Sequence, residues 1–337
     1  MSRREISIAF QTDKSAAQYI ALAKLVNGYA FDRVSVYCDA PYHPAFAALL
    51  LMAPHITQAR IGVAALPPSR IHPIDIAAQA ALLAELAQGG IYLGFARGAW
   101  LGDMGIQEPA EPIQAVREAV EVTRYLLSGA SGGYRGNVYS LADHVRAPYP
   151  LPDRLPPILI GSWGAKLCAV AGEIADEVKV GGSSNPDLIP TIQAYIAVGE
   201  QKAQRHSGAV GVVMGAVTVI DEDRKAARAA ARRAAAQYLP VVAPLDPTLQ
   251  VEPDRLQRIQ TLTHQGDYEA AAALISDDLL ERFAFSGDSA DIIRQAEALF
   301  AAGASRIEFG TPHGIHPEAG IHLLGKRVLP ALKEYTS

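Results

Sequence analysis

The feature that most constrains the fold is a regular alternation of short apolar runs with longer helical patterns. The helical patterns cover residues 15–28, 44–54, 73–88, 110–128, 164–173, 187–206, 222–238 and 289–302. The runs are rich in β-branched residues and cover residues 5–10, 33–38, 59–66, 90–96, 156–162, 176–182, 210–220 and 304–310. Strands separated by helices indicate βαβ units and a parallel sheet.

The number of βα units favours a closed (β/α)8 TIM barrel over a doubly wound open sheet, which remains the alternative fold. We expect a single domain over residues 1–337, because α/β barrels of this length form one unit. Two segments are longer than the connections that a minimal barrel needs. Residues 128–157, rich in Gly, Pro and Tyr, predict an insertion with a small hairpin, and residues 239–285 predict a second insertion whose part 267–285 is helical.

Composition limits the class of function. Half of the residues are hydrophobic, and the formal net charge is -5. This balance argues against a nucleic-acid partner, which requires a basic face. The two cysteines offer neither a disulfide framework nor a metal cluster. We also expect no metal site at His313, His316 and His322, because no acidic or cysteine ligand stands at suitable spacing.

No targeting or membrane segment is expected. The N-terminal residues enter a strand at once, and no apolar run approaches the ~20 residues needed to cross a bilayer. The sequence therefore predicts a soluble, cytoplasmic protein with no membrane partner.

The carboxyl ends of barrel strands carry the active site in this type of fold, so residues after each run are candidates. Glycines there allow backbone N–H groups to approach an anion, and a following helix N-terminus favours negative charge. The candidates for phosphate binding follow the fifth and sixth runs and are Gly161, Ser162, Trp163, Gly164, Gly181, Gly182 and Ser183. An alternative is that Ser183 and Asn185 only cap helices.

The fourth run ends in Arg97, Gly98 and Trp100, which supply a cation, a bare backbone position and a stacking surface at the same rim. Arg97 has an alternative use as an ion-pair partner of Asp103 or Glu108. We expect Gln11 and Trp100 to shape a substrate pocket.

Several stretches resemble the luciferase-like flavin- and deazaflavin-dependent oxidoreductases, and most of all their coenzyme F420-dependent methylenetetrahydromethanopterin reductase branch. These stretches are "IGVAALPPSRIHP" (61–73), "IYLGFARGAW" (91–100), residues 156–182 and residues 285–310. The resemblance implies a deazaflavin or flavin in the barrel mouth and a non-prolyl cis peptide at Ala64–Ala65, with Leu66 beside it. It also places Asp39 near the ring, as the candidate catalytic residue.

The chain departs from the family pattern at two positions. Ala40 follows Asp39 where the family has His, and Ala99-Trp100 stands where an acidic residue is common. Three functions stay open: an F420-dependent oxidoreductase acting on a small molecule, an FMN-dependent monooxygenase served by a separate flavin reductase, and a barrel that has lost its cofactor. The family also implies a homodimer, for which the apolar helices at 44–54 and 73–88 are the candidate interface.

Overall fold

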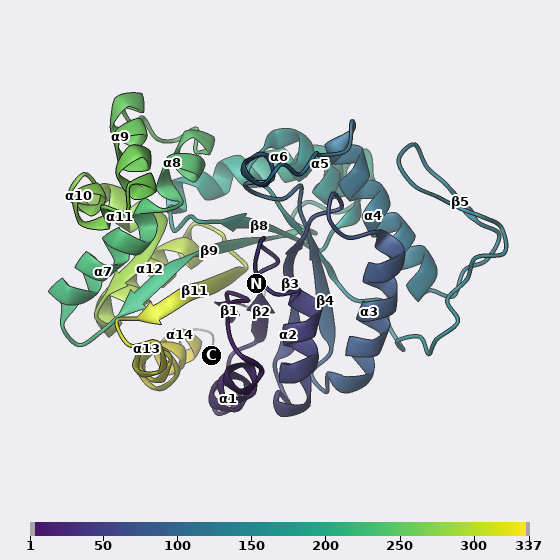
Figure 1. The fold of residues 1–337 in the computed structure, drawn as a ribbon, viewed down its shortest axis with the longest axis horizontal. Coiled ribbons are helices and arrows are strands. Elements are labelled where there is room, and N and C mark those ends of the chain that lie inside the picture. The colour runs from purple at the N-terminus through teal and green to yellow at the C-terminus, as the bar shows by residue number, and fades with distance from the viewer. Residues whose placement is uncertain (1–3, 335–337) are drawn as a thin grey trace.

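A closed parallel barrel forms the centre of the molecule, as the computed structural model shows for residues 4–334 (Figure 1). The barrel strands are β1 (Glu5–Phe10), β2 (Arg33–Val36), β3 (Arg60–Leu66), β4 (Ile91–Phe95), β7 (Ile158–Gly161), β8 (Glu177–Gly181), β9 (Gly211–Ile220) and β11 (Arg306–Gly314). Each strand pairs in parallel with its neighbours, and β9 closes the ring by pairing with both β8 and β11. The predicted (β/α)8 barrel is confirmed.

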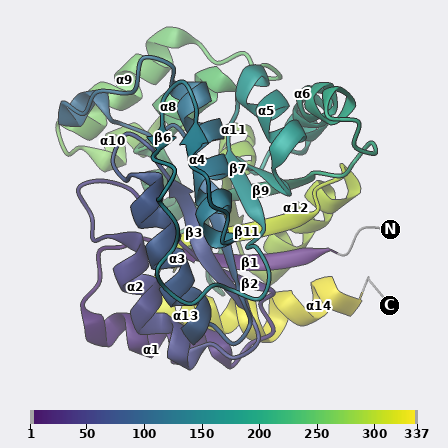
Figure 2. The same cartoon turned by 90° about the vertical axis from the view of Figure 1, so that its right-hand side faces the viewer.

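Helices cover the outside of the strands (Figure 2). They are α1 (Ala16–Asn27), α2 (Ala45–Met52), α3 (Pro73–Leu86), α4 (Pro112–Leu127), α5 (Ala165–Ile174), α6 (Ile189–Lys202), α7 (Arg224–Ala236), α12 (Ser289–Ala301), α13 (Pro317–Leu323) and α14 (Leu329–Glu334). Local sequence sets several boundaries. Capping boxes start α1 at Ser15 and α12 at Asp288, and proline occupies the first turn of α3 and α4.

The two segments predicted as insertions, residues 128–157 and 239–285, lie on opposite sides of the barrel in Figure 1. The first contains the expected hairpin, β5 (Tyr134–Arg135) and β6 (Ser140–Leu141). The second contains α8 (Leu239–Val242), α9 (Pro253–His264), α10 (Tyr268–Ala273) and α11 (Asp277–Phe283), and it packs with α7 on a hydrophobic cluster of its own.

One strand was not predicted. Residues Ala284–Gly287 form β10, which pairs with the end of β9 outside the closed ring. The expectation of helix up to residue 285 is therefore wrong for Ala284 and Phe285. The apolar side chains of α11 continue into β10 without a change of pattern, so hydrophobicity alone gave no boundary.

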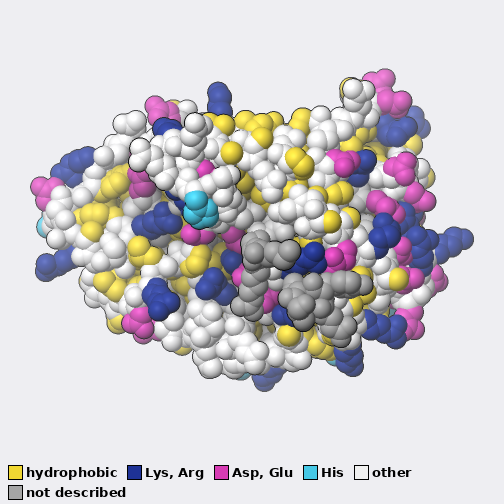
Figure 3. All heavy atoms as spheres, turned by 180° about the vertical axis from the view of Figure 1, so that it is seen from behind, with side chains coloured by type: hydrophobic (Ala, Val, Ile, Leu, Met, Phe, Trp, Pro, Cys, Tyr) yellow, Lys and Arg dark blue, Asp and Glu magenta, His cyan; other side chains and the backbone are white. Residues whose placement is uncertain are grey.

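The surface mixes both signs of charge with apolar side chains on the face seen in Figure 3. Within residues 4–334, no helix is long and apolar enough to span a membrane.

Candidate functional site

Three strands bring small residues together at the carboxyl end of the barrel. Ala65 is the residue before the last of β3, Ala96 follows β4, and Gly161 ends β7. A β-carbon built on Gly161 would lie 3.3 Å from the Ala96 β-carbon and 3.8 Å from the Ala65 β-carbon. All three residues are half-buried. They form a flat surface with no side chain larger than a methyl group, which we call the small-residue wall.

The peptide bond between Ala64 and Ala65 is cis, as the sequence resemblance implied. The register between β3 and β4 shifts at this point, between Val63 and Leu66. Leu66 itself is fully buried in the hydrophobic core, so only its backbone is near the mouth, where its carbonyl accepts a hydrogen bond from Ala96.

Asp39 and Gln11 lie side by side at the ends of β2 and β1. The Gln11 Nε2 donates to Asp39 Oδ2 at 2.9 Å, and Gln11 Oε1 accepts from the Thr12 backbone at 2.9 Å. Both side chains are half-buried. The amide therefore fixes one carboxylate oxygen of Asp39, and within residues 4–334 the other has no hydrogen-bond partner.

The loop after β4 does not present Arg97 as a free cation. Its guanidinium forms a two-point ion pair with Glu108, with contacts of 3.0 and 2.6 Å, which is the predicted alternative. Gly98 packs against the loop after β3, since a β-carbon there would lie 3.0 Å from Pro67 Cβ. Trp100 is 42% exposed.

The loop after β7 exposes the start of α5. Gly164 is the N-cap residue, and its backbone N–H donates to Ser162 Oγ at 3.1 Å. Within the described chain, no side chain caps the helix, and Gly164, Ala165 and Lys166 are exposed. Trp163 closes the loop on the next strand by donating from Nε1 to the Gly181 carbonyl at 3.0 Å. The free N–H groups suit an anion.

The loop after β8 is largely occupied by the second insertion. Ser183 is buried, and its hydroxyl accepts from the Asn185 backbone and donates to the Arg282 carbonyl. Asn185 caps the following turn, as the alternative predicted. A β-carbon on Gly182 would lie 3.3 Å from the Tyr238 ring. Gly181 is exposed, with nothing within 4 Å of a built β-carbon.

A buried charge network fills the barrel below these loops, and the sequence analysis missed it. The carboxylate of Glu308 pairs with Lys179 and accepts from Ser35 Oγ at 2.6 Å, while Arg306 binds Glu177 at 2.7 and 3.1 Å. Burial would raise the pKa of Glu308, but the charges of Lys179 and Arg306 lower it below its ordinary value. The period-two placement of charged residues in β8 and β11 was the available signal.

His313, which the sequence offered only as part of a rejected metal cluster, takes a structural position near the mouth. His313, in β11, is buried and contacts the Ala9 carbonyl through Nε2 at 3.1 Å. Burial lowers its pKa to about 4. His322 instead contacts the Tyr29 hydroxyl.

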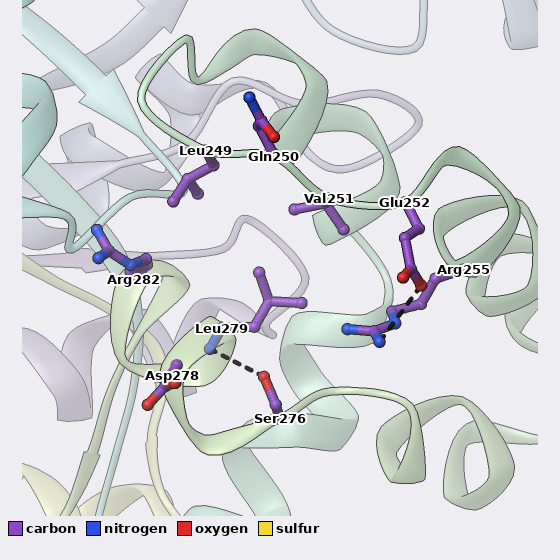
Figure 4. A pocket seen from close by; sticks show the side chains of 9 residues that line it. All are labelled: Leu249, Gln250, Val251, Glu252, Arg255, Ser276, Asp278, Leu279 and Arg282. Carbon is purple, nitrogen blue, oxygen red and sulfur yellow. Dashed lines mark hydrogen bonds and ion pairs between the residues drawn. The ribbon is translucent and has the colours of Figure 1, made fainter.

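The second insertion holds a cavity of about 200 Å³ between the starts of α9 and α11 (Figure 4). The two arginines on its lining are already paired, Arg255 with Glu252 and Arg282 with Asp187. The cavity is separate from the small-residue wall, so we do not include it in the candidate site.

Comparison with known proteins agrees with this architecture. A curated relative, the 5,10-methylenetetrahydromethanopterin reductase of Archaeoglobus fulgidus, is 26% identical over 98% of this chain and all of its own. The reductase of Methanopyrus kandleri is 25% identical over 99% of this chain and all of its own.

Solved structures share the fold. The structure of the coenzyme F420-dependent tetrahydromethanopterin reductase from Methanopyrus kandleri superimposes with a TM-score of 0.89, at 23% identity over 98% of this chain and all of that one. The structure of an F420-dependent secondary alcohol dehydrogenase in complex with an F420-acetone adduct superimposes with a TM-score of 0.77, at 17% identity over 98% of this chain and 99% of that one. The model of the luciferase-like monooxygenase family matches residues 5–306. The chain therefore belongs to the luciferase-like monooxygenase family.

Proposed function

We propose that this chain is a coenzyme F420-dependent oxidoreductase that transfers a hydride between the deazaflavin and a small organic substrate. Two curated relatives that align over nearly the whole chain are 5,10-methylenetetrahydromethanopterin reductases. Other relatives are named as F420-dependent dehydrogenases. The observation that carries the proposal is the small-residue wall, because a flat tricyclic ring needs a surface free of projecting side chains.

The wall meets the steric requirement of such a ring. Gly161 has no space for a larger residue without pressing on Ala96, and Ala64 and Ala65 present only methyl groups. When bound, the deazaflavin supplies a ring carbon that donates or accepts a hydride. The protein's own part is to orient the ring and the substrate and to handle the proton.

Within this proposal, the loop after β7 binds the cofactor phosphate. Gly161, Ser162 and Gly164 form the bend that leads into the exposed, uncapped start of α5, and the phosphate would lie against this helix N-terminus. Gly181 and Gly182 line the same rim. The Ser183 hydroxyl is already hydrogen-bonded inside the protein, so Ser183 holds the loop in shape and does not donate to the phosphate.

Asp39 is the proposed proton carrier, positioned by Gln11. Gln11 and Trp100 border the substrate space, and the loop carrying Arg97 and Gly98 forms its outer edge. We assign no specific substrate, because the loops that enclose it differ from the family pattern after Asp39 and Ala99.

A binding titration tests the proposal. Purified protein is titrated with F420 and, separately, with FMN, and ligand fluorescence is followed. We expect micromolar or tighter binding of F420 and weak binding of FMN. Tight FMN binding with oxygen consumption in the presence of reduced FMN would support a monooxygenase that requires a flavin reductase, and binding of neither would refute both.

A variant links the result to the wall. Ala96→Leu places a branched side chain on the surface and should abolish F420 binding, while Ala229→Leu, on the exposed face of α7, should bind like the wild type. Equal binding by both variants would place the cofactor elsewhere.

We propose in addition that the protein forms a homodimer through α2 and α3. These helices carry exposed large apolar residues, Leu51, Ile74, Leu82 and Leu86. Light scattering of the purified chain measures the mass directly, and a monomeric mass would refute the assignment.

A further inference from the structure

The inward-facing residues of the barrel become small in the layer directly above the charge network. Strand alternation gives the next set of inward-facing positions towards the carboxyl ends. They are Ala9, Tyr37, Ala64, Gly94, Gly161, Gly181, Gly215 and Gly310. Among these positions, Tyr37 alone carries more than a methyl group. This upper layer of the barrel, here called the hollow, is therefore lined by glycine and alanine, and Tyr37 supplies its one large side chain.

The glycines around the hollow make room for Tyr37 and for the ion pair beneath it. A β-carbon built on Gly310 would lie 2.5 Å from the Tyr37 hydroxyl. One built on Gly215 would lie 3.3 Å from Lys179 Cε and from Glu308 Cβ. The Lys179 ammonium lies 5.0 Å from the centre of the Tyr37 ring. The tyrosine ring thus crosses the barrel from β2 towards β11 and covers the Lys179–Glu308 pair.

The Tyr37 hydroxyl has no hydrogen-bond partner within residues 4–334. Its residue is only half-buried, and the nearby Gly181 borders open space. Burial raises the pKa of Tyr37 well above its ordinary value, and the charges of Glu308 and Asp39 raise it further. The phenol therefore keeps its proton at neutral pH and is available as a donor.

An unpaired donor on a half-buried side chain suits a ligand with acceptor atoms. The polar edge of a deazaflavin ring carries carbonyl oxygens and a ring nitrogen that accept hydrogen bonds. The small-residue wall borders the same hollow through Gly161.

We propose that Tyr37 is a cofactor-contacting residue whose ring supports the bound deazaflavin from inside the barrel and whose hydroxyl donates a hydrogen bond to the polar edge of the deazaflavin ring. This assignment rests on the proposed function. It identifies a contact that comes from the barrel interior, below the loops that hold the remainder of the cofactor.

The test compares Tyr37→Phe with the wild type in F420 titrations. One neutral hydrogen bond corresponds to roughly a threefold to tenfold increase in Kd. The absorption maximum of bound F420 should also move towards that of the free coenzyme, because the donor acts on the chromophore. Tyr195→Phe is the matched control, since Tyr195 is half-buried on the outer helix α6. It should leave both readouts unchanged.

Gly310→Ala gives a second test, because its methyl group would press on the Tyr37 hydroxyl and also on the Ala216 carbonyl oxygen, 2.8 Å away. It should weaken F420 binding as Tyr37→Phe does. If the wild type does not bind F420, the proposed function fails. If the wild type binds and Tyr37→Phe shows the same Kd and spectrum, the Tyr37 assignment is overturned while the proposed function stands.

Discussion

Removing both members of the Lys179–Glu308 pair should cost less stability than the two single removals added together. Glu308 is fully buried, and Lys179 is 7% exposed. The network around them is balanced, with Lys179, Arg33 and Arg306 matching Glu308, Glu177 and Glu5. Lys179→Met leaves one excess negative charge in the barrel, and Glu308→Gln leaves one excess positive charge.

The magnitude follows from the burial of the pair. Removing one partner of a buried pair costs about 3–5 kcal/mol, because the remaining charge stays desolvated and uncompensated. The double variant Lys179→Met/Glu308→Gln restores the balance, while Arg306 keeps its two contacts with Glu177. We therefore expect the double variant to lose far less than the sum of the single losses, with a coupling energy of about 2–3 kcal/mol.

Guanidinium unfolding of the four proteins measures this coupling, provided that the transitions are two-state. The exposed pair Arg327–Glu222, at 2.8 Å with side chains 58% and 69% exposed, is the matched control. The same cycle there should give a coupling of only about 0.2–1 kcal/mol. Additive losses at Lys179 and Glu308 would refute the reasoning, because they would mean that the two charges are stabilised independently.

Two further perturbations address the first insertion and the β11 histidine. Glu118→Ala removes the buried carboxylate that accepts hydrogen bonds from the backbone N–H groups of residues 137–139 at 2.7–2.8 Å. The variant should lose about 2–4 kcal/mol of stability and show faster amide hydrogen exchange selectively in the hairpin. Unchanged exchange in the hairpin would contradict this prediction. His313, with its pKa lowered to about 4, stays neutral when folded, so the unfolded chain takes up the extra proton as pH falls from about 6.5 to 4. Stability should fall across this window in the wild type and less in His313→Gln, and parallel curves would refute the assignment.

Sequence periodicity was sufficient for the barrel because its strands and helices have distinct, local patterns. The hairpin and the cis peptide at Ala64–Ala65 were also anticipated, the second through family resemblance. The partners of Arg97 and Ser183 could not be decided in the same way. For each residue, a structural role and a ligand-binding role were equally compatible with the local sequence. Only the positions of Glu108 and Arg282 in the fold distinguish the two roles.

The charge network was hidden for another reason. Lys179 and Glu308 are 129 positions apart, and they meet only because the closed barrel brings β8, β9 and β11 together around one interior. Alternation shows that both side chains point inward, but the pairing depends on how far the strands are staggered as the barrel closes. Sequence reasoning can therefore identify inward charges without identifying their partners.

The position of the candidate site follows from how the barrel interior is divided. Barrels of this class are usually filled by layers of branched apolar side chains, whereas here long charged side chains fill the lower part and glycine and alanine line the upper part. Larger residues above would have to displace the ends of Tyr37 and Lys179, as the built β-carbons at Gly310 and Gly215 indicate. The same small residues that accommodate the network also line the layer that the proposed cofactor would meet. The stability of the lower barrel and the small side chains of the upper barrel are consequently linked. Substitutions at Gly215 or Gly310 should therefore lower both stability and cofactor binding.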